Sequence, residues 1–180
     1  MLGRLARITL LTSILALAAA IGAAGTPGNE SDWVPNLGWV NDSAGVLTRA
    51  QQQRLASTLE QYQQETHHQI TILTIPSLDG ETIERFSLRT ANAWGLANKG
   101  FDDGILVTLA MKEHRVRIEL GNGMQRFISD ADAQKIIDTD MTPLFSKGDI
   151  SGGLGRGINR LMERGRRFVV DIAPAANRSN

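Results

Sequence analysis

The sequence contains no cysteine in its 180 residues. Disulfide scaffolds, thiolate zinc sites, cysteine-ligated iron–sulfur clusters and cysteine nucleophiles are therefore excluded. A lipid-bearing N-terminal cysteine is excluded for the same reason. Any metal site in this protein must do without thiolates, which directs attention to oxygen ligands.

The chain also has no excess of charge of either sign, with 19 basic and 19 acidic residues. Binding to nucleic acid through counterion release needs a basic surface, so we expect no nucleic-acid partner. Long apolar runs are scarce as well, because no stretch after the N-terminal segment approaches the ~20 residues of a membrane span. We therefore expect no transmembrane segment in the mature chain.

The N-terminal segment has the three parts of a secretory signal. Arg4 and Arg7 form a positive region, residues 8–21 form an apolar region, and residues 22–24 supply small side chains for a signal peptidase. The alternative is an uncleaved membrane anchor, but the apolar run is shorter than the ~20 residues that a span needs. We predict a signal peptide over residues 1–24, so that the protein is exported and is either periplasmic or secreted. Its removal leaves 17 basic and 19 acidic residues, a net charge of −2.

The rest of the chain has the composition of one folded domain with short ends. The whole sequence is 42% hydrophobic, which is enough for a core. Residues 25–37 are polar and contain proline and glycine, as flexible leaders do. We therefore predict a leader over residues 25–37, a domain over residues 38–172 and a disordered tail over residues 173–180.

The first half of the domain alternates between helical and strand patterns. Thr48 and Gln51 have the spacing of a capping box, and apolar residues then recur at helical spacing. Residues 69–75 are apolar and β-branched, which is typical of a strand. Residues 79–80 open a second helix, for which Gly95 is the expected C-terminal cap.

The second half predicts a hairpin of strands. Residues 104–110 are continuously apolar, which indicates a central strand that is covered on both faces. Residues 115–120 alternate between apolar and charged side chains, so only one face of that strand is buried. The short reversal over residues 111–114 makes the two strands antiparallel partners.

Two helices complete the predicted domain. Ser129 and Asp132 form a second capping pattern, and the helix that they open should stop at Pro143. A last helix is expected over residues 151–172. The fold class is therefore α/β, a three-layer α/β/α sandwich with a small mixed sheet. The expected element order is α-β-α-β-β-α-α, with a further short strand before Asp42 as an option.

Acidic residues gather in the predicted loops. Asp102 and Asp103 lie directly before the central strand, Asp42 lies before the first helix, and Asp149 lies before the last helix. Because loops at the end of an α/β sheet converge, these carboxylates are candidates for one site. Carboxylate oxygens suit Ca²⁺ better than Zn²⁺. The alternative is turn and cap chemistry, since Asp-Gly is a common turn and Asp42 or Asp149 could cap a helix.

Several blocks of the sequence, taken in order, resemble the TPM domain family. The central block is residues 98–107, and further blocks lie at 40–48, 69–72, 78–84, 94–95, 116–123 and 143–149. The resemblance covers roughly residues 40–161. Carried over residue by residue, the acidic loop of the family falls on Asp102 and Asp103, and its opening aspartate falls on Asp42. The family often has asparagine at the position of Asp103, so the extra charge here favours a cation.

The resemblance implies a compact α/β/α domain that binds Ca²⁺, with Mg²⁺ or Mn²⁺ as alternatives, at Asp42, Asp102 and Asp103. Members include secreted or membrane-attached bacterial proteins and a plant thylakoid-lumen protein that is linked to photosystem II repair. The plant protein was described as an acid phosphatase.

We therefore expect an accessory module that acts on another envelope protein. The alternative is a metal-dependent, acid-phosphatase-like phosphomonoester hydrolase, in which Asp102 or Asp103 holds the ion and Arg117 neutralises developing charge. The residues themselves indicate no catalytic nucleophile, and weak phosphatase activity follows from the resemblance alone.

Overall fold

The computed structural model describes residues 34–96 and 102–172, with side chains through residue 166. The predicted signal peptide, most of the leader and the tail lie outside the described residues. The elements are β1 (Val40–Asp42), α1 (Arg49–Thr66), β2 (Ile70–Ile75), α2 (Ile83–Trp94), β3 (Ile105–Ala110), β4 (Arg115–Leu120), η2 (Met124–Arg126), α3 (Asp130–Ile136), η3 (Ile137–Met141), α4 (Thr142–Phe145) and α5 (Ile150–Ile172).

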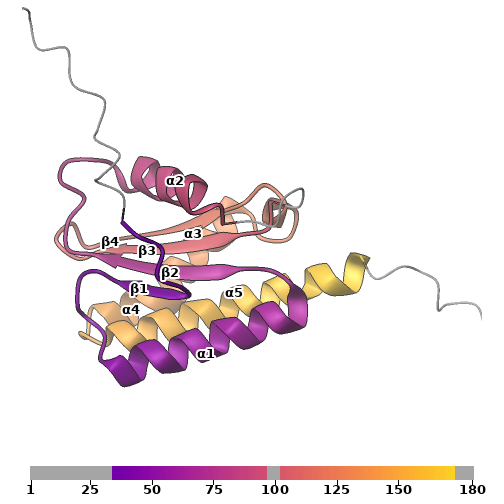
Figure 1. Ribbon diagram of the computed structural model, residues 1–180, viewed down its shortest axis with the longest axis horizontal. Coiled ribbons are helices and arrows are strands. Elements are labelled where there is room, and N and C mark those ends of the chain that lie inside the picture. The colour runs from indigo at the N-terminus through magenta and orange to yellow at the C-terminus, as the bar shows by residue number, and fades with distance from the viewer. Residues whose placement is uncertain (1–33, 97–101, 173–180) are drawn as a thin grey trace, which may run out of the picture. The chain divides into compact units, whose positions relative to one another are not determined.

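The four strands form one mixed sheet in the order β1-β2-β3-β4. β1, β2 and β3 are parallel, and β4 runs antiparallel to β3. The register places Ile70 beside Ile105, and Val107 beside Ile118. Helices cover both faces of this sheet (Figure 1). The predicted α/β/α sandwich with a mixed sheet is therefore confirmed, with β1 added at its start.

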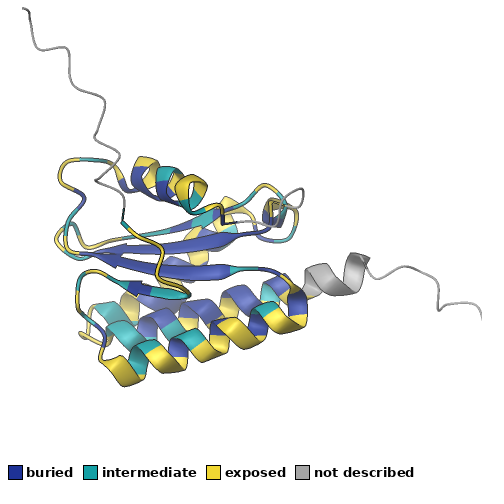
Figure 2. Ribbon diagram, viewed as in Figure 1, coloured by how far each residue is buried: buried dark blue, intermediate teal, exposed yellow. Residues whose placement is uncertain are grey.

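Side chains from the two faces of the sheet enter two separate cores. Ile105 and Val107 of β3 pack with α1, α3 and α5, whereas Leu106 and Ala110 pack with α2. β2 and β3 are buried at every position, which explains why their sequences read as continuous apolar runs (Figure 2). β4 is less buried, as its alternating sequence predicts.

The two crossover connections between the parallel strands, one through α1 and one through α2, have opposite handedness. The order β1-β2-β3 moves across the sheet in one direction, yet α1 packs on one face and α2 packs on the other. Two successive crossovers that move in the same direction but over opposite faces have opposite handedness. One of them is therefore left-handed, against the strong preference for right-handed β-α-β units. No pattern in the sequence indicates this exception.

Local signals at the helix ends agree with the structure in most places. Both predicted capping boxes form, at Thr48 with Gln51 and at Ser129 with Asp132. Gly95 caps α2 in the left-handed region, as predicted. Among the described residues, no helix combines the length and the apolar composition that crossing a membrane requires.

The predicted stop at Pro143 is wrong. The helix that starts at Asp130 changes to a π-helical turn at Ile137, and Pro143 lies in the first turn of α4. A proline in a first turn loses no hydrogen bond, because the N–H groups there have no partner within the helix. The proline therefore begins a short helix instead of ending a long one.

Candidate functional site

Two loops are joined at the amino-terminal end of β3. The backbone N–H of Gly121 donates to the carbonyl of Gly104 (2.8 Å), and that of Gly123 donates to the carbonyl of Asp102 (2.9 Å). A Cβ atom on Gly121 would lie 2.1 Å from the Asp102 carbonyl oxygen, and one on Gly104 would lie 1.7 Å from the Leu96 carbonyl oxygen. Glycine is therefore required for the close approach that fixes the position of Asp102.

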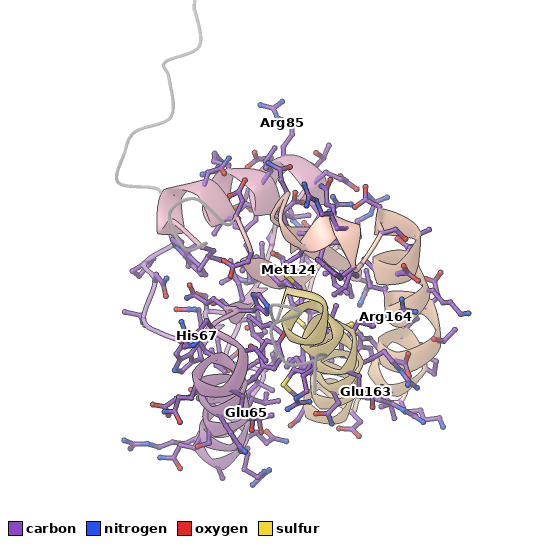
Figure 3. The ribbon with its side chains drawn as sticks, turned by 90° about the vertical axis from the view of Figure 1, so that its right-hand side faces the viewer. Glu65, His67, Arg85, Met124, Glu163 and Arg164 are labelled. Carbon is purple, nitrogen blue, oxygen red and sulfur yellow. The ribbon has the colours of Figure 1, made fainter. Side chains whose placement is uncertain are left out.

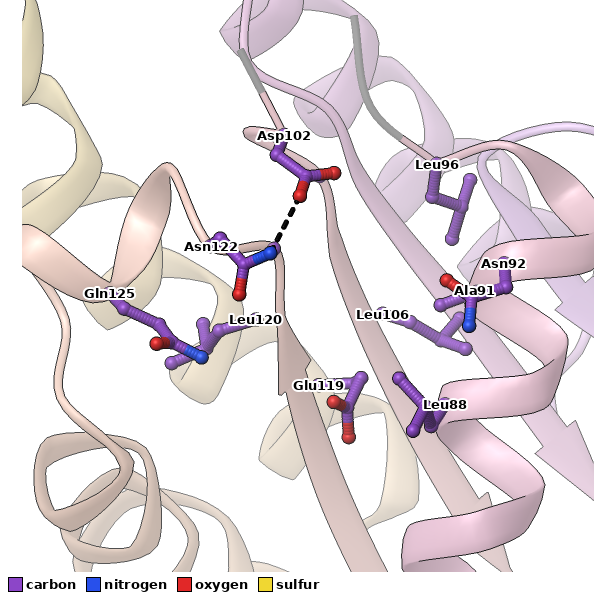
Figure 4. A pocket seen from close by; sticks show the side chains of 12 residues that line it. Leu88, Ala91, Asn92, Leu96, Asp102, Leu106, Glu119, Leu120, Asn122 and Gln125 are labelled. Atoms are coloured by element: carbon purple, nitrogen blue, oxygen red, sulfur yellow. Dashed lines mark hydrogen bonds between the residues drawn. The ribbon is translucent and has the colours of Figure 1, made fainter. Parts of the chain in front are cut away.

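Asp102 lies exposed at the rim of a cavity of about 270 Å³ between α2 and the ends of β3 and β4 (Figure 4). Its backbone has a φ of 52°, and its Oδ2 accepts a hydrogen bond from Asn122 Nδ2 (2.8 Å). Glu119 lines the same cavity, and its Oε2 accepts from Arg117 Nε (3.0 Å). The side chains that line this cavity and carry oxygen are Asn92, Asp102, Glu119, Asn122 and Gln125.

Asp103 does not share this environment, although it is the next residue. It is buried, and its Oδ2 lies 2.8 Å from Nδ1 of His68, which is buried too. His67 ends α1 in the left-handed conformation, with a φ of 64°, and thereby turns the chain so that His68 enters the interior. The structure therefore places the carboxylate of Asp103, a predicted cation ligand, in an interior pair with His68.

Tyr62 of α1 extends this buried polar group. Burial raises the pKa of Tyr62 to about 12, and the negative charge of Asp103 adds to the rise, while Thr66 and Arg166 oppose it. A Cβ atom on Gly165 of α5 would lie 2.0 Å from the Tyr62 hydroxyl oxygen, so the two helices are in close contact here. Figure 3 looks onto this end of the molecule and shows His67 where α1 finishes. The group is a packed interior cluster.

Asp42 ends β1, where its carboxylate organises the following loop. Oδ2 accepts from the backbone N–H of Leu47 (2.9 Å) and from Gln52 Nε2 (3.1 Å). Oδ1 accepts from the backbone N–H of Val46 (3.1 Å) and from the hydroxyl of Thr74. Four donors therefore occupy this carboxylate, which is the loop chemistry that the sequence left open as an alternative.

The structure does not bring Asp42 to Asp102 and Asp103. Asp42 pairs with Thr74 at the carboxyl end of the parallel strands, whereas Asp103 precedes Ile105, which pairs with Ile70 at the amino end. The four residue steps from Ile70 to Thr74 span about 13 Å. The expectation of one cluster overlooked that Asp42 follows a strand and the Asp102–Asp103 pair precedes one. Asp149 is engaged elsewhere, since its Oδ1 accepts from Gly152 N (2.8 Å) in the first turn of α5.

A larger cavity, of about 630 Å³, lies at the opposite end of β3. Its walls include Leu109, Met111, Val116, Phe145 and Ile150, and no acidic residue lines it. Its apolar walls do not suit a cation. The smaller cavity at Asp102 is therefore the candidate site for ion chemistry.

The residues at the smaller cavity fit a weakly held, hard cation. Asp102 provides a carboxylate, and Asn122 provides an amide oxygen if its side-chain amide is rotated by 180°. Glu119 lines the same cavity at its other end, because it pairs with Leu106, four residues or about 13 Å along β3 from Asp102. Within the ranges that the structure describes, no three acidic or histidine side chains lie close enough together to chelate a metal. Ca²⁺ accepts six to eight oxygen ligands and tolerates water among them, so this donor set suits Ca²⁺ better than Zn²⁺.

Sequence reasoning missed three residues of this region. His68 stands next to His67, and adjacent histidines on a helix point in different directions and make a poor chelate. The chain reverses at His67, however, and His68 enters the interior, where it meets Asp103. Asn122 reads as part of a Gly-Asn-Gly turn, and Glu119 reads as a solvated strand residue. The alternation of β4 did place Glu119 on a face opposite to the apolar residues, and this signal could have found it.

Comparison with known proteins agrees with this architecture. The family model of the TPM domain matches residues 40–164. The N-terminal domain of a protein from P. gingivalis, solved by NMR, is 28% identical with a TM-score of 0.68, and the match covers 73% of this chain and 84% of that one. No curated protein matches the chain.

Two further solved structures share the fold at lower identity. The BA42 protein from the psychrophilic bacterium Bizionia argentinensis is 15% identical with a TM-score of 0.61, covering 68% of this chain and 83% of that one. The N-terminal domain of a Corynebacterium glutamicum protein is 16% identical with a TM-score of 0.56, covering 85% and 90%. Together with the family match over most of the described fold, they lead to one conclusion: the chain belongs to the TPM domain family.

Proposed function

We propose that this chain is an exported TPM domain that binds a divalent cation, with Ca²⁺ as the expected ion, and serves as an accessory module in the cell envelope. The observation that carries cation binding is the cavity at Asp102, which is lined by five oxygen-bearing side chains and has the hydrogen-bonded pair of Asp102 and Asn122 at its rim. Export is supported by the signal-like composition of residues 1–24. It predicts that the mature protein recovered from its producing cells lacks those residues by intact mass.

The proposed donors are Asp102, which the sequence predicted, and Asn122 beside it. Asp102 is exposed and is held by backbone contacts that require glycine at its neighbours, so its carboxylate is presented without a large cost in conformational entropy. Glu119 is paired with Arg117, so its negative charge attracts a cation less strongly than the charge of Asp102 does. We therefore expect a dissociation constant in the range of roughly 10⁻⁴–10⁻³ M, typical of extracellular calcium modules.

Replacing Asp102 with asparagine should weaken Ca²⁺ binding at least about tenfold, because the variant loses the only carboxylate at the rim that has no cationic partner among the described side chains. Asparagine tolerates the left-handed backbone at this position, so the fold should be retained. The measurement is a titration of amide resonances with Ca²⁺, Mg²⁺ and Mn²⁺ in turn.

Asp79 offers a control of the same kind, since it is an exposed aspartate with a φ of 48°. It follows the carboxyl end of β2, whereas Asp102 lies at the amino end of the parallel strands. Asp79→Asn should leave the affinity unchanged. The proposal fails if Asp102→Asn binds Ca²⁺ as the parent does, or if millimolar Ca²⁺ changes neither the amide spectrum nor the melting temperature of the parent. Turnover of a generic phosphomonoester that depends on both the ion and Asp102 would identify the hydrolase instead.

A further inference from the structure

The larger cavity lies at the carboxyl end of β3, where the core between the sheet and α1, α3 and α5 stops. Ile105, Val107 and Leu109 share one face of β3, and the first two belong to that core. Leu109 is only 4% exposed, yet it is not among the residues of either core within the described ranges. It lines the cavity of about 630 Å³ instead, together with Val116, its partner in the register.

The opposite wall follows a break in regular helical geometry. The π-helical turn η3 replaces the regular helix at Ile137, and the short helix α4 and its exit loop come directly after it. From this segment the cavity is lined by Thr142, Phe145, Ser146, Gly148 and Ile150. Single π-helical turns within helices are frequent at functional sites, so this wall is a second sign of a binding site.

The cavity has the size and the lining of a pocket for a small molecule. Such pockets commonly measure about 300–1,000 Å³ and combine apolar walls with a few polar groups. The apolar side chains of Met111, Val116, Phe145 and Ile150 are half-buried, so a ligand can reach them from solvent. The polar side chains that line the cavity are those of His114, Thr142 and Ser146.

The basic residues beside this cavity favour an anion. Lys112 lies in the turn of residues 111–114, and Lys147 lies in the loop of residues 146–149, and both segments contribute to the lining. Both lysines are exposed. Neither forms an ion pair with any side chain that the structure describes. Their ammonium groups are therefore available to a ligand.

The two acidic residues of the same segments are engaged in local hydrogen bonds. Glu113 Oε1 accepts from the hydroxyl of Ser77 (3.0 Å) and from the backbone N–H of Leu78 (3.1 Å). Asp149 Oδ1 accepts from the backbone N–H of Gly152 (2.8 Å) in the first turn of α5. These bonds hold both carboxylates against neighbouring backbone, so they do not cancel the attraction of the lysines for an anion.

We propose that this cavity binds a small organic anion that has an apolar body and a single carboxylate or sulfonate group. The apolar body lies against Leu109, Val116 and Phe145, and burial of its surface supplies most of the affinity. The charged group stays near the rim, where the flexible stems of Lys112 and Lys147 let an ammonium group reach it.

This site is separate from the proposed cation site. Leu106 lines the cavity at Asp102 on the face of β3 that α2 covers, whereas Leu109 lines this cavity on the opposite face. Loss of cation binding therefore leaves this proposal standing.

Displacement of a fluorescent dye tests the proposal. The dye 8-anilinonaphthalene-1-sulfonate is itself an apolar anion, and it marks apolar surface that a protein leaves accessible. Its fluorescence should rise with the folded protein, and octanoate should displace it with a dissociation constant of roughly 10⁻⁴–10⁻³ M. Octylammonium has the same chain with the opposite charge, so it should bind at least about fivefold more weakly.

Amide resonances locate the bound octanoate independently of the dye. The shifted resonances should belong to residues 109–116 and 142–150, which line the cavity. Ser146→Trp places a large side chain at an exposed position of the wall, so it should weaken octanoate binding at least about tenfold. Circular dichroism of this variant should match the parent.

The double variant Lys112→Glu with Lys147→Glu tests the charge without altering the walls. It should weaken octanoate at least about fivefold and remove the preference over octylammonium. Arg49→Glu with Arg54→Glu is the matched control, because both arginines are exposed on α1 and the change in net charge is the same. This control should bind octanoate as the parent does, since α1 contributes no residue to the cavity.

Three results would each overturn the proposal. Octanoate could bind no more tightly than octylammonium, the shifted amides could lie outside the two lining segments, or the arginine control could weaken binding as much as the lysine variant. A protein that binds neither the dye nor octanoate also overturns it, and would leave the cavity to an apolar side chain of a partner protein.

Discussion

Replacing Asp103 with alanine should lower the free energy of unfolding by about 3 kcal/mol, because Nδ1 of the buried His68 then loses its carboxylate partner. The side chains of His68 and Asp103 are only 3% and 4% exposed, so water cannot replace the lost interaction. In a domain of this size the melting temperature should fall by roughly 10 °C. Urea unfolding followed by circular dichroism measures the change.

Asp102→Asn provides the comparison, since it alters the adjacent carboxylate at an exposed position and should cost less than about 0.5 kcal/mol. Asp103→Asn keeps the shape of the side chain and should lie between the two. If Asp103→Asn and Asp103→Ala are no more destabilising than Asp102→Asn, the interior pair does not stabilise the fold. Folded Asp103→Asn should still bind Ca²⁺ as the parent does, because its side chain is not among the proposed ligands.

Replacing Gly104 with alanine should destabilise the domain by about 3 kcal/mol. The new Cβ atom would lie 1.7 Å from the carbonyl oxygen and 2.4 Å from the carbonyl carbon of Leu96, so backbone must move. Forcing extra atoms into a packed region typically costs about 1–3 kcal/mol, and a clash with backbone lies at the upper end. The displaced loop also carries Asp102, so Ca²⁺ affinity should fall together with stability.

Gly155→Ala should have the opposite sign. Gly155 lies inside α5, and its added Cβ atom would meet Leu55 at 3.9 Å, an ordinary van der Waals distance. Alanine should therefore stabilise the helix by up to about 1 kcal/mol. Equal effects of the two substitutions in thermal unfolding would contradict the view that the approach of Leu96 to Gly104 restricts the loop.

Much of the fold was predictable because the signals are local. Thr48 with Gln51, and Ser129 with Asp132, specify helix starts through contacts within four residues, and both capping boxes are present. The apolar run of β3 predicts burial on both faces, and the structure confirms it at every position. These features depend on side-chain chemistry and spacing alone.

The candidate site was predictable only in part, because it depends on which end of the sheet each loop occupies. Asp102 and Asp103 are adjacent in sequence, but one faces the solvent and the other contacts His68 across the interior. Asp42 has the same residue type and lies at the other end of the parallel strands. No local sequence pattern indicates where each carboxylate lies, because strand direction and the reversal of the chain at His67 determine its position.

The unequal cores on the two faces of the sheet have a consequence for how the molecule opens. Twenty buried residues join α1, α3 and α5 to the sheet, whereas eight join α2 to it. In regions with fewer buried apolar contacts, local opening costs less free energy, so the backbone amides exchange their hydrogens with water faster. We expect the amides of α2 to exchange faster than the buried amides of α5 under native conditions. Because Leu88, Asn92 and Leu96 form one wall of the cavity at Asp102, excursions of this layer would reshape the cavity without unfolding the rest of the domain.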